Sequence, residues 1–318
     1  MTMHKRLLPL VALLATGASL AVAAGPAQAN FKVGMADQFG SMYENPLYQS
    51  LKIKRVRYLV PWDWYKHKGQ NAEVVGYMAA AQAARTDVLV HFTARRGCYN
   101  NGRYSKRKVC RAPSVKTFTK SFKRFKKAYP WVKTYGVWNE ANHPSQPTVR
   151  KPRLAAKYFL ALRKNCGGCK IVALDVLDTK NMQSYVAAFR RNAKNKARIY
   201  GLHNYGDVNR HRSSGTRRLL AVAPGEVWLT ETGGILKFGR DYPRNAKRQA
   251  KATKYMFKLA DKYDKRRSGL RGRITRLYNY QWTGAPKSAR FDAGLVNVDG
   301  SARKAYKVFK RQAKKHAR

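Results

Sequence analysis

The chain has 318 residues, 44% of them hydrophobic, and a formal net charge of +50. Its Lys and Arg are spread along the whole length, often opposite the apolar side of helical segments, which favours a solvated basic surface over a localised nucleic-acid site. After residue 29 no segment is long and apolar enough to cross a bilayer, which excludes a spanning helix there. So large a charge also disfavours self-association, so we expect a monomer. Because the basic residues are spread along the chain, we expect no specific nucleic-acid partner.

The first 29 residues have the layout of a secretory signal peptide. A basic start with Lys5 and Arg6 is followed by an apolar stretch from residue 7 to about 24 and by the small-residue ending at 27–29. A membrane anchor is the alternative, which the short apolar run with its several Gly, Ala and Ser disfavours. We therefore expect a secreted protein whose mature part, residues 30–318, forms one domain of a length that a barrel fills.

From Lys32 onward, short β-rich runs alternate with longer stretches of helical spacing, an order that predicts parallel strands joined by crossover helices. The predicted strands cover residues 32–38, 54–62, 87–94, 134–141, 170–178, 198–206, 226–234 and 276–284. Eight strand-helix units favour an α/β fold of the closed (β/α)8, or TIM-barrel, type in a single domain. A doubly wound open sheet is the competing fold, because strand counts from pattern alone carry an error of one or two.

Two of the helical stretches have clear inner faces. One has Val115, Phe118, Phe122 and Phe125 on a single stripe, with lysines outside it. The last stretch, residues 302–318, is expected to be a closing helix whose inner face carries Ala305, Val308, Phe309 and Gln312.

Four cysteines remain in a chain that we expect to be exported, and their spacing suggests two local disulfides, Cys98 with Cys110 and Cys166 with Cys169. The first would close a basic loop. The CGGC sequence of the second pair could instead be a redox motif or half of a metal site, although no second such motif and no nearby His cluster accompanies it.

Glutamate is scarce, and its placement is therefore informative. The chain has five, of which Glu140 and Glu231 end β-like runs. In a barrel the active groups gather at the C-terminal ends of the strands. A carboxylate facing the interior costs free energy unless it is hydrogen-bonded or paired, so these two need a function or a structural partner. Pairing of each glutamate with a core arginine is the structural alternative.

The two runs, VWNEANHP around Glu140 and WLTETGG around Glu231, resemble those of the clan A glycoside hydrolases, the group that includes family 5 cellulase-like and family 39 xylosidase-like enzymes. In that group an Asn-Glu pair closes strand four and its Glu is the acid/base, which implies this role for Glu140 beside Asn139. A second Glu closes strand seven as the nucleophile, which implies that role for Glu231.

The resemblance extends to other strand ends and covers the chain from about residue 32 to 284. Arg57 resembles the strand-two arginine that holds the nucleophile, and His203 and Tyr205 resemble the strand-six pair beside it. Trp282 resembles the strand-eight aromatic platform for a sugar. The resemblance therefore implies that the protein is a secreted retaining glycosidase, which cleaves O-glycosidic bonds of a polysaccharide or oligosaccharide.

Retaining cleavage needs two carboxyl groups about 5 to 5.5 Å apart, one protonated and one ionised. We expect Glu231, held by Arg57 and Tyr205, to attack the anomeric carbon, and Glu140, facing that negative charge, to keep its proton and donate it to the leaving oxygen. Asn139 would bond the sugar 2-hydroxyl.

Aromatic faces stack on pyranose rings, so several residues near the strand ends are candidates for the sugar cleft. His91 and Trp282 are the preferred ones, and the others are Trp62, Trp64, Trp138 and His143. Asp37, Asp175 and Asp178 also end predicted strands, and we interpret them as structural loop caps.

The positive charge suggests an acidic glycan or cell-envelope polymer as the carbohydrate substrate. A barrel without catalytic activity that binds anionic polymers such as acidic polysaccharide, teichoic acid or DNA is the second hypothesis. A nuclease or other metal hydrolase is a third. The Asp, Glu and His residues show no compact metal-ligand spacing, so we expect no metal and no cofactor.

Overall fold

The computed structural model describes residues 31–100, 102–240 and 242–316. The signal peptide predicted at residues 1–29 lies outside these ranges. In the described part of the chain, nine strands form one parallel sheet in the order β7-β6-β3-β2-β1-β12-β10-β9-β8. Their bounds are β1 Lys32–Ala36, β2 Arg55–Pro61, β3 Asp87–Thr93, β6 Thr134–Gly136, β7 Lys170–Val172, β8 Leu174–Leu177, β9 Ile199–His203, β10 Gly225–Thr232 and β12 Gly272–Tyr280.

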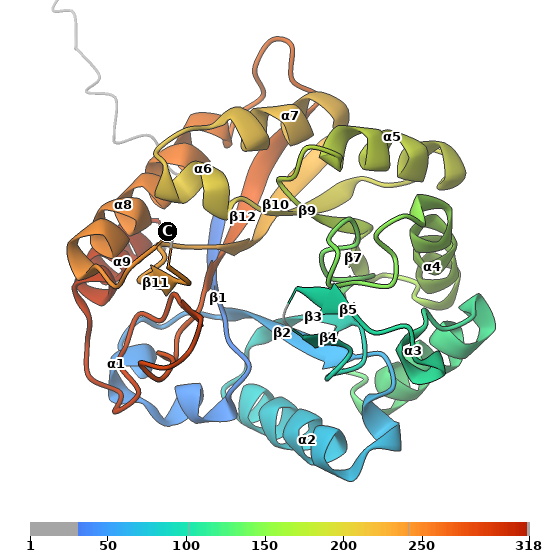
Figure 1. Ribbon diagram of the computed structural model, residues 1–318, viewed down its shortest axis with the longest axis horizontal. Coiled ribbons are helices and arrows are strands. Elements are labelled where there is room, and N and C mark those ends of the chain that lie inside the picture. The colour runs from blue at the N-terminus through green and yellow to red at the C-terminus, as the bar shows by residue number, and fades with distance from the viewer. Residues whose placement is uncertain (1–30, 101, 241, 317–318) are drawn as a thin grey trace, which may run out of the picture.

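The sheet closes because its two edge strands are consecutive in the chain. Only Ala173 separates β7 from β8, and its backbone N–H donates to the carbonyl of Ile199 in β9 at 2.9 Å. β7 and β8 therefore act as one strand with a break, and the structure is the eight-stranded barrel that the sequence predicts (Figure 1). All eight predicted runs contain a barrel strand, although the fourth is regular only over three residues and the last begins and ends about four residues earlier than expected.

Helices surround the barrel on all sides (Figure 1). Their bounds are α1 Pro46–Gln49, α2 Lys68–Ala83, α3 Val115–Ala128, α4 Pro152–Asn165, α5 Met182–Asn192, α6 Tyr205–Asn209, α7 Ser214–Val222, α8 Ala246–Tyr263 and α9 Lys304–Lys315. Three short 3₁₀ helices are also present in the described ranges, at Gly40–Glu44, Trp64–Lys66 and Lys108–Cys110. None of the helices in the described ranges is long and apolar enough to span a membrane.

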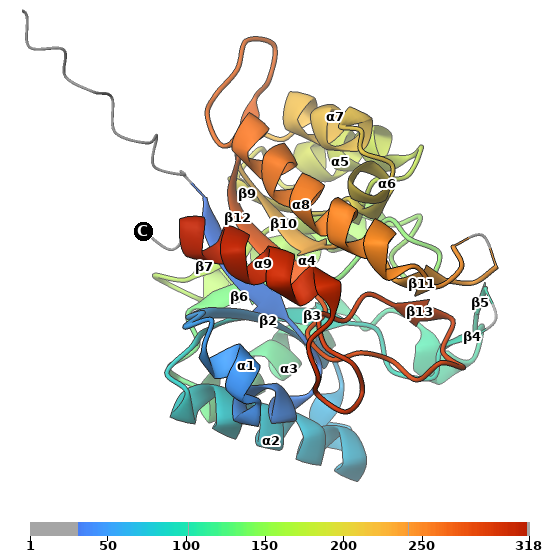
Figure 2. The ribbon, with the colours of Figure 1, turned by 90° about the vertical axis from the view of Figure 1, so that its left-hand side faces the viewer.

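The helical faces follow the sequence pattern closely. In α3, Phe118, Phe122 and Phe125 are fully buried, and Ser114 caps the helix by accepting from the Thr117 N–H. The predicted closing helix is α9, which lies beside α8 (Figure 2). Its inner face holds Ala305 and Phe309 as expected, but Tyr306 and Ala313 are buried there while Val308 and Gln312 are only half-buried.

Two separate layers of apolar side chains stabilise the barrel. The larger lies between the strands and the helices, and Trp64 and Trp138 belong to it. A small cluster fills the barrel interior and consists of Ala36, Leu89, Val172, Trp228 and Tyr278. Because the interior is plugged by this cluster, any site must lie above it, at the C-terminal ends of the strands.

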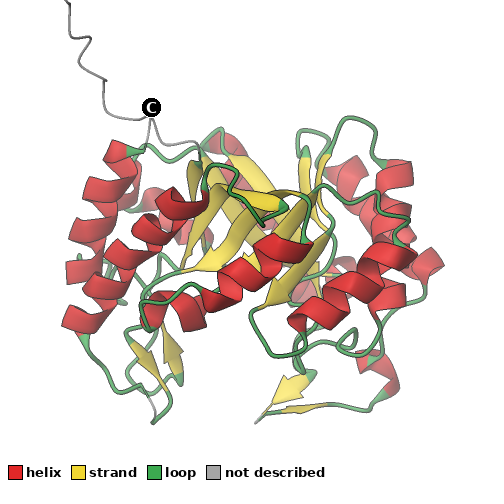
Figure 3. Ribbon diagram, turned by 90° about the horizontal axis from the view of Figure 1, so that it is seen from above, coloured by secondary structure: helices red, strands yellow, loops and turns green. Residues whose placement is uncertain are grey.

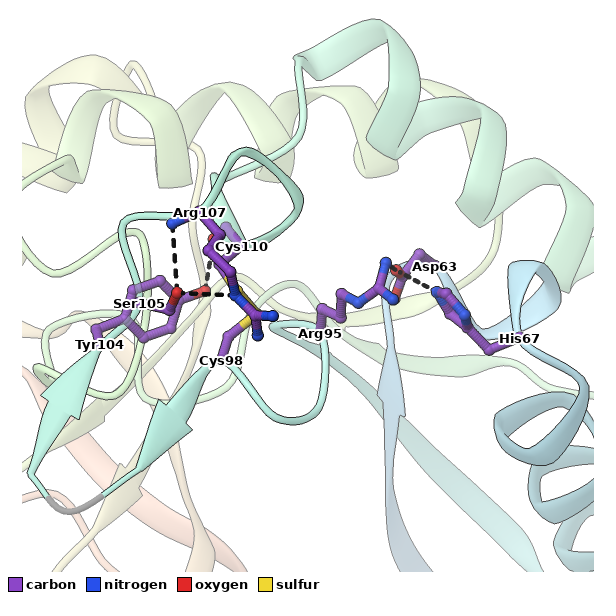
Figure 4. Close-up of a disulfide and its surroundings, with 8 residues drawn as sticks. All are labelled: Asp63, His67, Arg95, Cys98, Tyr104, Ser105, Arg107 and Cys110. Atoms are coloured by element: carbon purple, nitrogen blue, oxygen red, sulfur yellow. Dashed lines mark hydrogen bonds and ion pairs between the residues drawn. A yellow bond between two sulfur atoms is a disulfide. The ribbon is translucent and has the colours of Figure 1, made fainter.

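Two small antiparallel sheets stand at that end of the barrel (Figure 3). One pairs β4 (Tyr99–Asn100) with β5 (Arg103–Tyr104), and the other pairs β11 (Lys237–Phe238) with β13 (Phe291–Asp292). Both predicted disulfides are present, Cys98–Cys110 and Cys166–Cys169. The first closes the segment that carries β4 and β5, as Figure 4 shows, and the second closes the turn before β7.

Candidate active site

A bulge in β10 aims Glu231 into the barrel mouth. Residues 226–228 pair with residues 199–201 of β9 in an unbroken register, but Glu231 pairs with His203, so β10 contains one extra residue between them. An extra residue reverses which side of the strand the following side chains face. Trp228 has its side chain in the barrel interior. Without the extra residue, the Glu231 side chain would lie on the opposite face of the strand from Trp228 and would point away from the interior.

Glu140 follows β6 in a segment whose backbone N–H groups bond both neighbouring strands. Asn139 donates to the carbonyl of Phe92 at 2.8 Å, and Ala141 donates to the carbonyl of Asp175 at 2.9 Å. Between them Glu140 has φ of 44°, in the left-handed region that non-glycine residues rarely adopt. Such backbone conformations concentrate at functional sites.

The two glutamates approach each other closely at the mouth. One carboxylate oxygen of Glu140, one of Glu231 and one ring nitrogen of His203 all lie within 4.8 Å of one another. Both carboxylates keep contact with solvent, because the Glu140 side chain is 19% exposed and the Glu231 side chain 12%. Among the described residues this trio is also the one group of His, Cys, Asp and Glu with metal-ligand spacing.

Arg57 holds Glu231 from below. Its side chain is fully buried, and its Nη1 donates to Glu231 Oε2 at 2.8 Å, while Nη2 donates to Asn139 Oδ1 at 2.6 Å. Burial opposes its charge, but the charges of Glu231 and Asp175 raise the pKa of Arg57, which stays cationic. On the opposite side, the Tyr205 hydroxyl donates to Glu231 Oε1 at 3.0 Å. Burial and the Glu231 charge raise the pKa of Tyr205 well above its usual value, so it remains a donor.

His203 connects Glu140 with a buried aspartate. Its Nδ1 lies 3.0 Å from Glu140 Oε1 and 3.6 Å from Glu231 Oε2, and its Nε2 lies 2.9 Å from Asp175 Oδ2. Burial alone would lower the pKa of His203, but the charges of Asp175 and Glu231 and the hydrogen bonds to Asp175 and Glu140 raise it to about 10. His203 is therefore a cation at neutral pH.

This cation changes the proton assignment expected from the sequence. Burial raises the pKa of Glu140, but the hydrogen bond and charge of His203, with a further contribution from His143, lower it below its usual value. In the free protein the proton shared between these side chains is thus on His203. The sequence predicts that Glu140 keeps its proton, and the direction of this pKa shift is opposite to that expectation, because His203 lies between the two carboxylates.

The C-terminal two thirds of the chain match a protein-family model, described as "Glycosyl hydrolase catalytic core", over residues 99–309. The chain belongs to this family. It is a glycosidase, as the sequence motifs indicated. A search of curated proteins by sequence finds no match.

Solved structures of clan A glycoside hydrolases share the barrel of this glycosidase. A GH5_18 protein from Streptomyces cattleya, in complex with GlcNAc, is 12% identical with a TM-score of 0.63, over 91% of this chain and 81% of that one. A GH5_18 protein from Bifidobacterium longum, in complex with Manβ1-4GlcNAc, is 14% identical with a TM-score of 0.59, over 90% and 78%. Native xylanase 10B from Thermotoga maritima is 13% identical with a TM-score of 0.57, over 91% and 97%.

Two residues predicted to contact sugar lie elsewhere in the glycosidase. His91 is fully buried below the mouth, where its Nδ1 accepts from Arg57 Nε at 3.0 Å, and burial lowers its pKa to about 3. Trp282 is 1% exposed and packs edge-on against Tyr48 and Tyr306 in the outer core. β12 ends at Tyr280, so Trp282 lies in the loop beyond the strand and not on the barrel mouth.

Tyr280 takes the place that the sequence analysis assigned to Trp282. It ends β12 opposite Ala36 of β1, and the inward-facing positions of this strand include Tyr278, two residues earlier. The Tyr280 ring stacks on Phe291, which also packs against Tyr205, and burial and the Glu231 charge raise the pKa of Tyr280. The period-two alternation of the strand contained this signal, because residues 278 and 280 share a face.

Asp175 is the second residue that the sequence analysis undervalued. It is fully buried and contacts His203, Arg57 at 3.5 Å, and Thr230, whose hydroxyl donates to Oδ1 at 2.5 Å. Burial raises the pKa of Asp175, but the charge and hydrogen bond of His203 and the charge of Arg57 hold it well below its usual range. A Cβ at Gly201 would lie 2.0 Å from Asp175 Oδ1, so glycine at 201 leaves the room that this carboxylate needs.

Of the remaining aromatic candidates, some lie behind the barrel wall and one lies at the mouth. Trp64 is buried against Phe125, and Trp138 is stacked on Tyr158, both behind the barrel wall. Trp62 is 9% exposed beneath Lys66. His143 is the candidate at the mouth, with Nδ1 3.7 Å from Glu140 Oε2.

Proposed function

We propose that the protein is a secreted retaining glycosidase in which Glu231 is the nucleophile and Glu140 the acid/base. The separation of the two carboxylates, below 4.8 Å between their nearest oxygens, carries the proposal. Retaining enzymes hold their carboxyl groups about 5–5.5 Å apart, whereas inverting enzymes need about 6.5–9.5 Å to admit a water molecule. The GlcNAc, Manβ1-4GlcNAc and xylan names of the fold relatives suggest a carbohydrate substrate without naming the sugar.

In the first step Glu231 attacks the anomeric carbon, and the bond to the leaving oxygen breaks. Arg57 and Tyr205 orient the carboxylate of Glu231, each bonding a different oxygen, so that it is fixed in one plane. Glu140 receives the proton of His203 Nδ1, 3.0 Å away, and passes it to the leaving oxygen, so that it is ionised again after the step. His203 is then neutral, with its Nε2 proton still directed at Asp175.

In the second step Glu140 removes a proton from water, which attacks the anomeric carbon and releases Glu231. The attachment of the sugar cancels the negative charge of Glu231. Glu140 then returns the proton to His203, which restores the starting state. In this proposal Asn139, whose Oδ1 accepts from Arg57, donates its amide N–H to the sugar 2-hydroxyl, and Tyr280 contacts the sugar ring.

The same trio does not suit a divalent cation. Arg57 lies 2.8 Å from Glu231, and His203 carries a proton toward Glu140, so a metal ion there would meet two positive charges. The positive charges of Arg57 and His203 therefore favour an acid/base function of the two glutamates over metal binding.

The leader, the two disulfides and the charge support export of residues 30–318 as one catalytic domain that acts as a monomer on an extracellular glycan. The charge of +50 favours an acidic polymer as that glycan.

The test is hydrolysis by the purified mature chain of neutral and uronic-acid polysaccharides and of activated aryl glycosides. Proton NMR of the first-formed product should show retention of the anomeric configuration. Glu231→Gln and Glu140→Gln should each lower kcat by at least about 10³-fold on unactivated substrates. Inverted product, or hydrolysis that survives both changes, would overturn the mechanism. Binding of anionic polymers without any cleavage would instead identify a catalytically silent barrel.

A further inference from the structure

A pocket of about 490 Å³ lies beside the catalytic pair, at the ends of β1, β2 and β3. Its volume falls within the roughly 300–1,000 Å³ of small-molecule sites. The pocket is connected to Glu140 through His143, whose Nδ1 lies 3.7 Å from Glu140 and 2.8 Å from the hydroxyl of Ser145, a lining residue. The ring of His143 is also 6.3 Å from that of Tyr99, which lines the other side.

The basic loop, which we define as residues 95–111, forms one wall of this pocket. Its sequence contains seven Lys and Arg and no Asp or Glu. Arg103, Lys106, Arg107, Lys108 and Arg111 are all exposed, and none of these five forms a salt bridge in the described structure. These five residues lie outside the pocket lining, but their uncompensated charges add a positive potential around it.

The loop is held in place by covalent and polar bonds. Cys98–Cys110 closes it, Tyr104 Oη donates to the carbonyl of Cys110 at 2.6 Å, and the Ser105 N–H donates to the carbonyl of Cys98 at 2.7 Å. Figure 4 shows Arg95 extending from the disulfide side of the loop toward Asp63. A wall fixed in this way loses little conformational entropy when it binds a ligand.

Two arginines line the pocket with donors to spare. Arg95 uses Nη1 for Asp63 at 3.5 Å, and Arg96 uses Nη1 for Glu73. Within the described ranges neither has a second carboxylate partner, so Nε and Nη2 of each can bond a ligand. The arginine fork matches a carboxylate in a planar, bidentate geometry. Phe39 and Tyr99, 57% and 41% exposed, offer apolar faces for a pyranose ring at the rim.

We propose that this pocket binds a uronic acid unit of the substrate, with Arg95 and Arg96 contacting its carboxylate. The inference rests on the proposed function, because it locates that unit next to the bond that Glu140 and Glu231 cleave. It attributes the preference for an acidic substrate to this one pocket and not to the overall charge of the protein.

Binding can be tested separately from catalysis. Hexasaccharides of galacturonate, of mannuronate and of alternating glucuronate and N-acetylglucosamine are titrated calorimetrically into the Glu231→Gln chain at about 0.15 M salt. Each is paired with its own carboxyl-reduced form, which keeps the ring and linkage but lacks the charge. At least one acidic ligand should bind about tenfold more tightly than its reduced counterpart. Equal binding of every pair would overturn the inference.

Three added substitutions then locate the effect. Arg95→Gln and Arg96→Gln should each weaken binding of that acidic ligand by about tenfold and leave the reduced ligand unchanged. Glu73→Gln, which frees Arg96 and removes a negative charge from the pocket, should tighten it by about threefold. Arg163→Gln, on the exposed side of α4, removes the same charge away from the pocket and should change binding by less than about twofold.

An Arg163→Gln effect as large as that of Arg96→Gln would show that the attraction is diffuse, and would overturn the inference. Failure of the proposed function has a different result. In that case wild type cleaves none of the substrates, or Glu231→Gln does not reduce cleavage, whatever the titrations give.

Discussion

Two glutamates of one strand have different surroundings at opposite ends of the barrel. At the start of β10, Glu226 Oε2 accepts from Trp228 Nε1 at 2.9 Å and from the Thr275 hydroxyl at 2.5 Å. Burial raises the pKa of Glu226, but these neutral donors lower it on balance. Near the end of β10, Glu231 is held instead by the buried cation Arg57 and lies close to a second carboxylate.

The difference shows how the barrel separates stability from function. Glu226 finds its donors two residues away and on the adjacent strand, so its bonds help to pair β10 with β12. Glu231 depends on residues from β2, β9 and the loop after β6, which meet only because the barrel closes. Charged groups gathered in this way interact strongly and shift one another's pKa values, as catalysis requires. Their burial contributes little net free energy to folding.

The largest expected effect compares the two glutamates directly. Glu231→Gln should lower kcat/KM by at least about 10³-fold, since it removes the attacking group, while Glu226→Gln should change it by less than about threefold. Conversely, Glu226→Gln should lower the free energy of unfolding by about 1–2 kcal/mol because a neutral amide accepts these hydrogen bonds less strongly. Kinetics and urea unfolding of both variants test this, and equal losses of activity would break the comparison.

The second prediction concerns Asp175, a positioning residue that touches His203 and not the substrate. Asp175→Asn removes the main counter-charge of His203, so kcat should fall by about 100-fold and its alkaline limb should move to lower pH. Stability should fall by about 3–5 kcal/mol because a buried cation loses its partner. The matched change at the other end, Asp87→Asn, removes a partly exposed partner of Arg276 and should leave the pH profile of kcat in place. A D175N profile identical in shape to wild type would contradict the role.

The third prediction is the pH dependence of stability. The folded-state pKa of His203 is about 10, above the value of about 6.5 for an unfolded histidine. Its contribution is therefore complete below about pH 6.5 and is lost as the pH rises through 10. The stability difference between wild type and Asp175→Asn should shrink over that interval, as measured by urea unfolding at a series of pH values. A difference that stays constant from pH 6 to 10 would mean that His203 is not held as a cation by Asp175.

The smallest effects on activity are expected from the disulfides. Cys98–Cys110 spans 12 residues and Cys166–Cys169 spans 3, so removal of each as a Ser pair should cost about 3 and about 2 kcal/mol by loop entropy. Only the first closes the basic loop at the mouth, and its loss should raise KM about threefold or more without changing kcat. The second pair lies before β7, where its loss should leave KM unchanged. A KM effect from the Cys166 and Cys169 pair would break the contrast between the two ends.

Local pattern was sufficient for much of this protein. The alternation of short β-rich runs with stretches of helical spacing located all eight barrel strands, and cysteine spacing identified both disulfides. Glu140 and Glu231 were identified because scarce acidic residues ended apolar runs, which is a property of neighbours in the chain. These features are readable because strand period, helix period and short loop closure depend on residues close in sequence.

Tertiary structure alone decided the rest. An extra residue in β10 turns Glu231 inward, and the register that reveals it exists only against β9. The end of β12 at residue 280 places Tyr280 at the mouth and Trp282 in the core. The proton on His203 is the clearest case, because its position depends on Asp175, Glu140 and Glu231, which lie on three other segments. Charge interactions act through space, so their balance is set once the barrel closes and not before.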